Sequence, residues 1–201
     1  MHAPVRKCVI GSKVLQSFDA DSRTQFLGQA LAGSAVRAFN AFMPKCTLSN
    51  PADKQQIIAR LKTIQATSPR QWGKMTAAQM LCHLADSFRV TIGEKHWQLA
   101  RVRVTPIPVP LWFLRWVALD LPMQWPQGTP TRPEVDAEAG GTKPGDFEND
   151  RQELLRLLHR FTRQPRDFEW DPHPIFGPLS ETEWMRWGYL HMDHHFRQFG
   201  A

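Results

Sequence analysis

The C-terminal segment, residues 181–199, constrains the fold of this chain most strongly, because every local signal in it favours one long helix. The segment contains no proline, and Gly200 follows it where a helix commonly ends. Ser180 and Glu183 have the spacing of a capping box, in which each side chain accepts a hydrogen bond from the other residue's backbone N–H. We therefore predict a helix over residues 181–199, around which the rest of the chain is organised.

Three further segments carry the same kind of signal. Each combines a capping residue with apolar residues at helical spacing: Asn50 precedes a helix that stops at Ser68, Thr76 precedes residues 77–90, and Asp146 precedes residues 147–161. No segment shows a strand pattern of convincing length. The sequence thus predicts an all-α fold, an up-and-down four-helix bundle with a long proline-rich connection between its second and third long helices.

Residues 98–140 form that connection, and their prolines exclude a long helix. Seven prolines between positions 106 and 133 flank one short apolar run, residues 111–119, which predicts a single short helix between extended loops. Connections of this length in small domains are often lids or binding loops. Four aromatic residues either close the mouth of a pocket or pack the loop onto the bundle, which is the commoner role: Trp112, Phe113, Trp116 and Trp125.

Residues 1–49 share no pattern with the rest of the chain. Small residues, scattered basic residues and weak periodicity favour an N-terminal extension, either poorly ordered or with a loose helix over residues 22–42. We place no chemistry there. The predicted organisation is therefore an extension, residues 1–49, followed by one helical domain, residues 50–201.

Composition narrows the functional classes. Hydrophobic residues make up 42% of the chain and charged residues 22%, as in ordinary soluble domains, and no apolar run of about 18 residues is present to span a membrane. The net charge is +6, but the basic residues are scattered, so nucleic-acid binding is not expected. Three cysteines without Cys-x-x-Cys spacing argue against a disulfide scaffold and a zinc ribbon, and favour a cytoplasmic protein.

Three of the eight histidines lie within five residues on the predicted C-terminal helix: His191, His194 and His195. His191 and His195 are four positions apart, about 40° around a helix and about 6 Å along it, so their imidazoles can converge on one point. Histidines on a helix face are usually surface residues or bonded within a core. This pair alone is therefore weak evidence for a metal site, and a third ligand elsewhere in the chain would strengthen it.

His83, on the second predicted helix, is the available third ligand. It lies at the edge of that helix's apolar stripe, so its ring can point into the bundle, although a lone histidine there is more often a satisfied core residue. With His191 and His195 it supplies three neutral nitrogen donors and leaves a coordination position open, which is typical of a reactive metal site. Neighbouring Cys82 is turned about 100° away around the helix. His194, three positions after His191, could replace His195 as a ligand or could form an outer contact.

Three other residues are candidates for catalysis or for a supporting role. Asp86, one turn from His83, and Asp193 could act as acid–base groups or could orient a ligating imidazole. His173 stands between two prolines shortly before the C-terminal helix, where its ring either lines a site or bonds to a backbone carbonyl. The sequence leaves these alternatives open.

Three motifs together resemble a known superfamily, in their order and spacing as well as in their residues. They are WGKMTAAQMLCH at residues 72–83, HPIFGP at residues 173–178 and HMDHHFRQ at residues 191–198. The chain resembles the DinB/YfiT-like superfamily of proposed metalloenzymes, specifically one of its domain-of-unknown-function branches. The likeness covers about residues 50–200.

The resemblance implies a four-helix bundle whose histidine triad, here His83, His191 and His195, holds a divalent ion, commonly zinc or nickel. It also implies a homodimer, because members of this superfamily are often dimers. Relatives include thiol-dependent transferases and isomerases that use mycothiol, bacillithiol or glutathione, so a low-molecular-weight thiol and a small-molecule substrate are expected. The expected function is a metal-dependent transferase or hydrolase. The alternative is a non-catalytic metal-binding or structural bundle.

Overall fold

The computed structural model describes residues 45–96 and 109–201. The helix expected over residues 22–42 and the first part of the connection lie outside these ranges. Within them, the chain is all-α, and its only β pairing is an isolated bridge between His173 and Gly177. None of the described helices combines the length and the apolar character needed to cross a lipid bilayer.

Four long helices and three short helical segments make up the described structure. The long helices are α2 (Pro51–Thr63), α3 (Ala77–Thr91), α5 (Phe147–Phe161) and α6 (Glu181–Gln198). The short segments are α4 (Leu111–Arg115), the π-helical turn η1 (Trp116–Asp120) and the 3-10 turn η2 (Pro133–Val135). The proline-flanked run therefore forms one short helical stretch, as predicted.

The predicted capping residues begin all four long helices. Asn50 and Asp146 accept hydrogen bonds from backbone N–H groups of the first turn, and the capping boxes at Thr76 and Ser180 are both complete. One helix end differs from the prediction, since α2 ends at Thr63 rather than at Ser68. The Ser68 hydroxyl and backbone bond to Gln65 and form a separate turn there.

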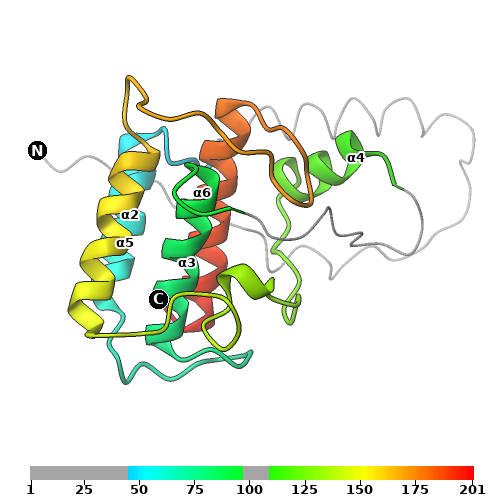
Figure 1. Ribbon diagram of the computed structural model, residues 1–201. Helices are drawn as coiled ribbons and strands as arrows, with labels where there is room; N and C mark the ends of the chain where they lie inside the picture. Colours follow the sequence, from blue (N-terminus) through cyan, green and yellow to red (C-terminus); the bar gives the residue numbers. More distant parts are fainter. Residues whose placement is uncertain (1–44, 97–108) are drawn as a thin grey trace, which may run out of the picture.

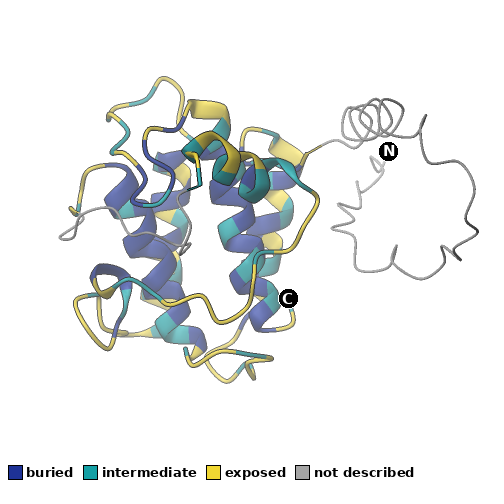
Figure 2. Cartoon of the chain, turned by 90° about the vertical axis from the view of Figure 1, so that its right-hand side faces the viewer, coloured by how far each residue is buried: buried dark blue, intermediate teal, exposed yellow. Residues whose placement is uncertain are grey.

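The four long helices lie side by side, and α4 lies to one side of them (Figure 1). Helix α3 packs against both α5 and α6, while α2 packs against α6. Their buried faces point inward (Figure 2) and share one core, with Ile57, Phe88, Phe161 and Trp184 among its fully buried side chains. This arrangement places α3 beside α6, the two helices that carry the candidate ligands.

Gly188 allows the chain before α2 to pack closely against α6. Leu48 is buried, and its backbone N–H donates to the carbonyl of Met185 at 3.1 Å. A Cβ added at Gly188 would lie 2.7 Å from Leu48 Cδ1 and 3.0 Å from Phe161 Cε1. The missing side chain of Gly188 thus leaves a notch in α6, which the side chains of Leu48 and Phe161 fill.

We expect Gly188→Val to destabilise the protein by about 1–3 kcal/mol, because the added methyl groups overpack this notch. Urea unfolding measures the change in the free energy of unfolding. Gly145→Val is the control, since Gly145 is exposed and its added Cβ would meet only Asp150, at 3.9 Å. Equal stability of the two variants would show that the notch is not tight.

Candidate metal centre

Three histidines from two helices converge in the structure. His83 lies in the second turn of α3, and His191 and His195 lie on successive turns of α6, on the same face of that helix. His83 and His195 are buried, and His191 is half-buried. One nitrogen from each of these three residues lies within 4.8 Å of the other two. The three histidines, called the triad below, therefore lie close enough to bind a metal ion.

One pair within the triad has the spacing of two ligands of a tetrahedral ion. Three nitrogens held about 2.0 Å from such an ion would be about 3.3 Å apart. The Nε2 atoms of His83 and His191 are 3.1 Å apart, and the ring centroids of the three pairs lie between 4.7 and 5.2 Å apart.

The hydrogen bond at His83 Nδ1 determines whether His83 Nε2, the atom that faces His191, carries a proton. His83 Nδ1 lies 3.0 Å from the carbonyl oxygen of Val135, which can only accept, so this nitrogen carries the proton. His83 Nε2 therefore presents a lone pair toward His191. Two facing lone pairs at this distance repel, so the contact calls for a proton on His191 or for a cation bound between the rings.

The electrostatics of the site keep all three imidazoles neutral. Burial is the main cause that lowers the pKa of each of them, and the charges of neighbouring histidines lower the pKa of His191 and His195 further. Neutral imidazole is the form that ligates metals. The buried triad is thus held in its ligand-competent state at neutral pH.

The metal-free protein is expected to lose stability as the pH falls below about 6.5. Unfolded histidines take up protons in that range, whereas the triad, whose pKa is lowered by burial, does not. The free energy of unfolding should then fall by up to about 1.4 kcal/mol per pH unit for each histidine. Urea unfolding with a chelator at pH 7.5, 6.0 and 5.0 measures this slope. A flat profile over that range would contradict it.

Two groups fix the orientation of the triad rings from outside. The Val135 carbonyl holds His83, as described, and the Gln198 side-chain oxygen accepts from His195 Nδ1–H at 3.0 Å. Gln198 itself donates to the carbonyl oxygen of Trp72 at 2.9 Å. Gly73 makes this close approach possible, since its φ is 78° and an added Cβ would lie 2.5 Å from Gln198 Nε2.

We expect Gln198→Leu to weaken metal binding about 10- to 100-fold, because His195 loses the partner that fixes its tautomer and ring orientation. Competition against a chelator of known affinity measures the effect. Gln152→Leu is the matched control, since Gln152 is exposed on α5 and its side chain donates to Glu148, its one side-chain partner among the described residues. If the Gln198 variant bound metal with wild-type affinity, Gln198 would not be needed to orient His195.

Neither aspartate candidate orients a triad ring. Both oxygens of Asp86 accept from Arg89, Lys95 and Thr142, at 2.7 to 2.9 Å. Asp193 is paired with two arginines on the other side of α6. Of the two alternatives for these aspartates, the structure shows no hydrogen bond that would orient an imidazole, since His83 and His195 bond to the Val135 carbonyl and the Gln198 amide instead.

The remaining candidates lie beside the triad rather than in it. His194 is not part of the converging group, and its ring packs edge-on to His195 at 5.2 Å. Burial raises the pKa of Cys82 to about 12, so its thiol stays protonated, and Cys82 also lies outside the group. His173 is buried, and its Nδ1 accepts from two backbone N–H groups, so this nitrogen does not make the bond to a backbone carbonyl that was one of its two alternatives.

Aromatic rings cover the triad. The Trp125 ring lies 6.0 Å from that of His191 and 6.2 Å from that of His194, and its indole N–H donates to the Ala118 carbonyl at 2.8 Å. The Trp187 ring lies 4.9 Å from that of His191. Of the four aromatic residues of the connection, only Trp125 reaches the site. The other three are exposed and outside the core, contrary to both expected roles: Trp112, Phe113 and Trp116.

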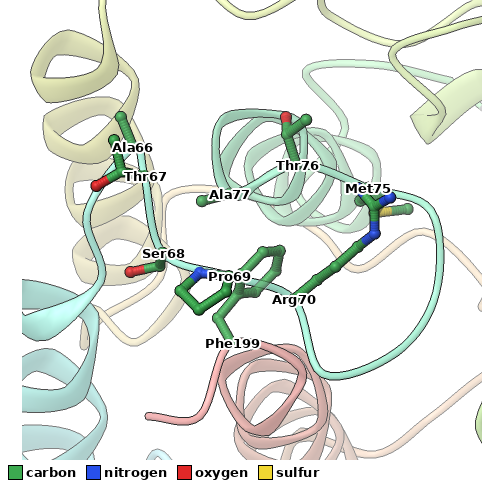
Figure 3. A pocket seen from close by; sticks show the side chains of 9 residues that line it. All are labelled: Ala66, Thr67, Ser68, Pro69, Arg70, Met75, Thr76, Ala77 and Phe199. Atoms are coloured by element: carbon green, nitrogen blue, oxygen red, sulfur yellow. The ribbon is translucent and has the colours of Figure 1, made fainter.

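The hollows described in the structure do not open onto the triad. The larger one, about 450 Å³, lies between residues 66–70, the start of α3 and Phe199 (Figure 3). The second, lined in part by Cys82 and Glu153, lies between α3 and α5. No triad histidine lines either of these two hollows, and the most exposed member of the triad is the half-buried His191.

Sequence reasoning missed Val135, Gln198 and Trp187. Gln198 follows His195 by three positions on the helix and could have been identified as a neighbour on the same face. The same spacing argument applies to Trp187, four positions before His191. Val135 had no such signal, because its contact with His83 spans 52 positions of the chain.

Comparison with known proteins gives one finding. Residues 47–201 match the model of a family described as a protein of unknown function (DUF1569). No curated protein and no solved structure matches the chain.

Proposed function

The chain belongs to the DUF1569 family, and we propose that it is a divalent-metal-dependent enzyme with a three-histidine site. The observation that carries the proposal is the convergence of His83, His191 and His195, from two helices and over a hundred positions apart, within 4.8 Å. The proposed framework is a DinB-like up-and-down four-helix bundle formed by residues 50–201. Residues 1–49 are proposed to be an extension, and residues 98–140 the long connection.

The donor set supports a reactive site rather than a closed structural one. Three neutral nitrogens leave a position of the ion open, and no described cysteine or carboxylate joins them as a fourth ligand. Zinc and nickel are the proposed ions, since both accept imidazole. Bound there, the ion would lower the pKa of a water or thiol and so supply a hydroxide or a thiolate at neutral pH.

The charge of the site favours an anionic ligand. The triad is neutral, so two positive charges of a bound ion would be uncompensated by the protein ligands. A small thiol, bound as its thiolate, satisfies this requirement. We propose a thiol-dependent transferase or a metal-assisted hydrolase that acts on a small molecule. We further propose a cytoplasmic homodimer that does not bind nucleic acid.

Cobalt-loaded protein tests the proposal, because the visible spectrum of Co²⁺ reports its ligands. Three-histidine coordination by wild type, with a new thiolate band on adding glutathione, is the expected result for the transferase. Binding of cobalt with hydrolysis of a 4-nitrophenyl ester, but without a thiolate band, would favour the hydrolase. Failure to bind cobalt would reject the metal site itself.

The cover over the triad supports one alternative, a non-catalytic metal-binding bundle. Trp125 lies over His191, and neither described hollow reaches the three histidines. A structural ion would be bound but would take up no added ligand. A cobalt spectrum that is unchanged by thiols and by small anions would therefore favour this alternative over an enzyme.

A further inference from the structure

The loop between α5 and α6 holds a histidine that the proposed metal site leaves unused. His173 is only 6% exposed, its ring stacks on Phe176 at 4.6 Å, and the ring of Trp187 meets it edge-on at 5.5 Å. The loop backbone is closed by paired hydrogen bonds of 2.9 and 2.8 Å between His173 and Gly177. The ring is therefore packed between aromatic rings in a closed loop.

The backbone of this loop also determines which ring nitrogen carries the proton. His173 Nδ1 accepts from the N–H groups of Ile175, at 3.1 Å, and Phe176, at 3.2 Å. A nitrogen that accepts has no proton, so the proton lies on Nε2. Burial, with a contribution from the charge of Arg132, lowers the pKa of His173 to about 3, so the ring is neutral at physiological pH.

The Nε2–H group of His173 has no acceptor among the described residues. This donor is held in place and is not used by the described residues, so it is available to a ligand. Because Nδ1 faces the loop, Nε2 faces away from it.

The triad lies near this loop. Trp187 contacts a histidine of each, with ring-centroid distances of 5.5 Å to His173 and 4.9 Å to His191. His173 is close enough to His191 for its charge to affect the pKa of His191. From the other side, residues 132–135 approach both sites, since the charge of Arg132 acts on His173 and Val135 bonds to His83.

We propose that His173 Nε2–H donates a hydrogen bond to an oxygen atom of the ligand held at the triad. The inference rests on the proposed metal site. A neutral imidazole with this tautomer can only donate at Nε2, so it selects ligands that carry an acceptor. Beside a cation with neutral ligands, the favoured class is a small molecule with an anionic or carbonyl oxygen next to its metal-bound atom. His173 is thus proposed to position and select the substrate.

Two anions that differ in hydrogen bonding test this role on cobalt-loaded protein. Acetate accepts strong hydrogen bonds through oxygen, whereas iodide is a poor acceptor, and both can be titrated against the cobalt spectrum. His173→Phe keeps the stacked ring and removes Nε2–H. We expect it to weaken acetate binding about tenfold or more and to leave iodide binding unchanged. His173→Gln, whose amide can donate from a similar place, should recover part of the acetate affinity.

His159→Gln is the control, since His159 is exposed on α5. Unchanged acetate binding in a cobalt-loaded His173→Phe variant would overturn the inference while leaving the proposed metal site intact. Equal losses for acetate and iodide, or loss of cobalt from both His173 variants, would show that His173 supports the structure instead of contacting the ligand. Absence of cobalt from the wild type would reject the metal site and this inference together.

Discussion

Replacement of His83 by alanine should abolish stoichiometric metal binding, and replacement of His195 should do the same. Each change removes one of the three proposed ligands, and His83 is the one that α3 contributes. Loss of a supporting residue around a metal ligand typically costs 10- to 100-fold in affinity. Loss of a ligand itself should therefore cost more than about 100-fold. Metal analysis of the purified variants beside wild type measures the stoichiometry.

Thermal unfolding gives a second measure of the same result. A metal that binds only the folded protein raises its stability, by about 2.7 kcal/mol when the free metal is at 100 times Kd. Added zinc should raise the Tm of wild type and leave that of His83→Ala unchanged. His194→Ala should retain the metal, because His194 lies outside the triad. If both His83→Ala and His195→Ala kept a full equivalent of metal, the proposed ligands would be wrong.

Asp86→Ala should unfold far more easily than wild type, although Asp86 lies only one turn from His83. Its side chain is fully buried and accepts charged hydrogen bonds from Arg89, at 2.9 Å, and Lys95, at 2.7 Å. It also bonds to the backbone and hydroxyl of Thr142, which ties the end of the connection to α3. Removing one member of a buried ion pair costs about 3–5 kcal/mol. We expect about 2–4 kcal/mol here, because the two cations are partly exposed.

The pH dependence of stability provides a test specific to the Asp86 charge. Burial alone raises the pKa of Asp86, but the hydrogen bonds from Lys95, Thr142 and Arg89 outweigh burial and hold its pKa below the usual value. Because the folded pKa is the lower one, the stabilisation is complete above about pH 4 and is lost as the pH falls through the folded pKa. Asp86→Asn should flatten this loss.

Metal content separates the structural role of Asp86 from a catalytic one. Asp86→Asn and Asp86→Ala should bind metal stoichiometrically at a temperature where both are folded, since Asp86 makes no hydrogen bond to the triad. Asp167→Asn is the control for a carboxylate of similar local charge, because Asp167 is exposed and pairs with surface arginines. If Asp86→Ala lost no more stability than Asp167→Asn, the proposed stabilising role of the buried Asp86 carboxylate would be wrong.

The helices and the ligand pair on α6 could be predicted because their causes are local. A capping box needs residues three positions apart, and the spacing of His191 and His195 places both on one face of any helix. The end of α2 could not be predicted, because Ser68 bonds back to Gln65 and forms a separate turn. The partners of Asp86 and Asp193 could not be predicted, because Thr142 lies 56 positions from Asp86 and Arg60 lies 133 positions from Asp193.

The sequence by itself determined which residues could ligate a metal, since residue type and helical spacing are properties of short segments. Only the tertiary structure decided what holds those ligands and what covers them. The contact of His83 with Val135 and that of Gln198 with Trp72 join positions 52 and 126 apart. Such pairs form because packing of α3 against α6 and closure of the connection bring polar groups together that must then bond with one another. No local pattern in the chain encodes that pairing.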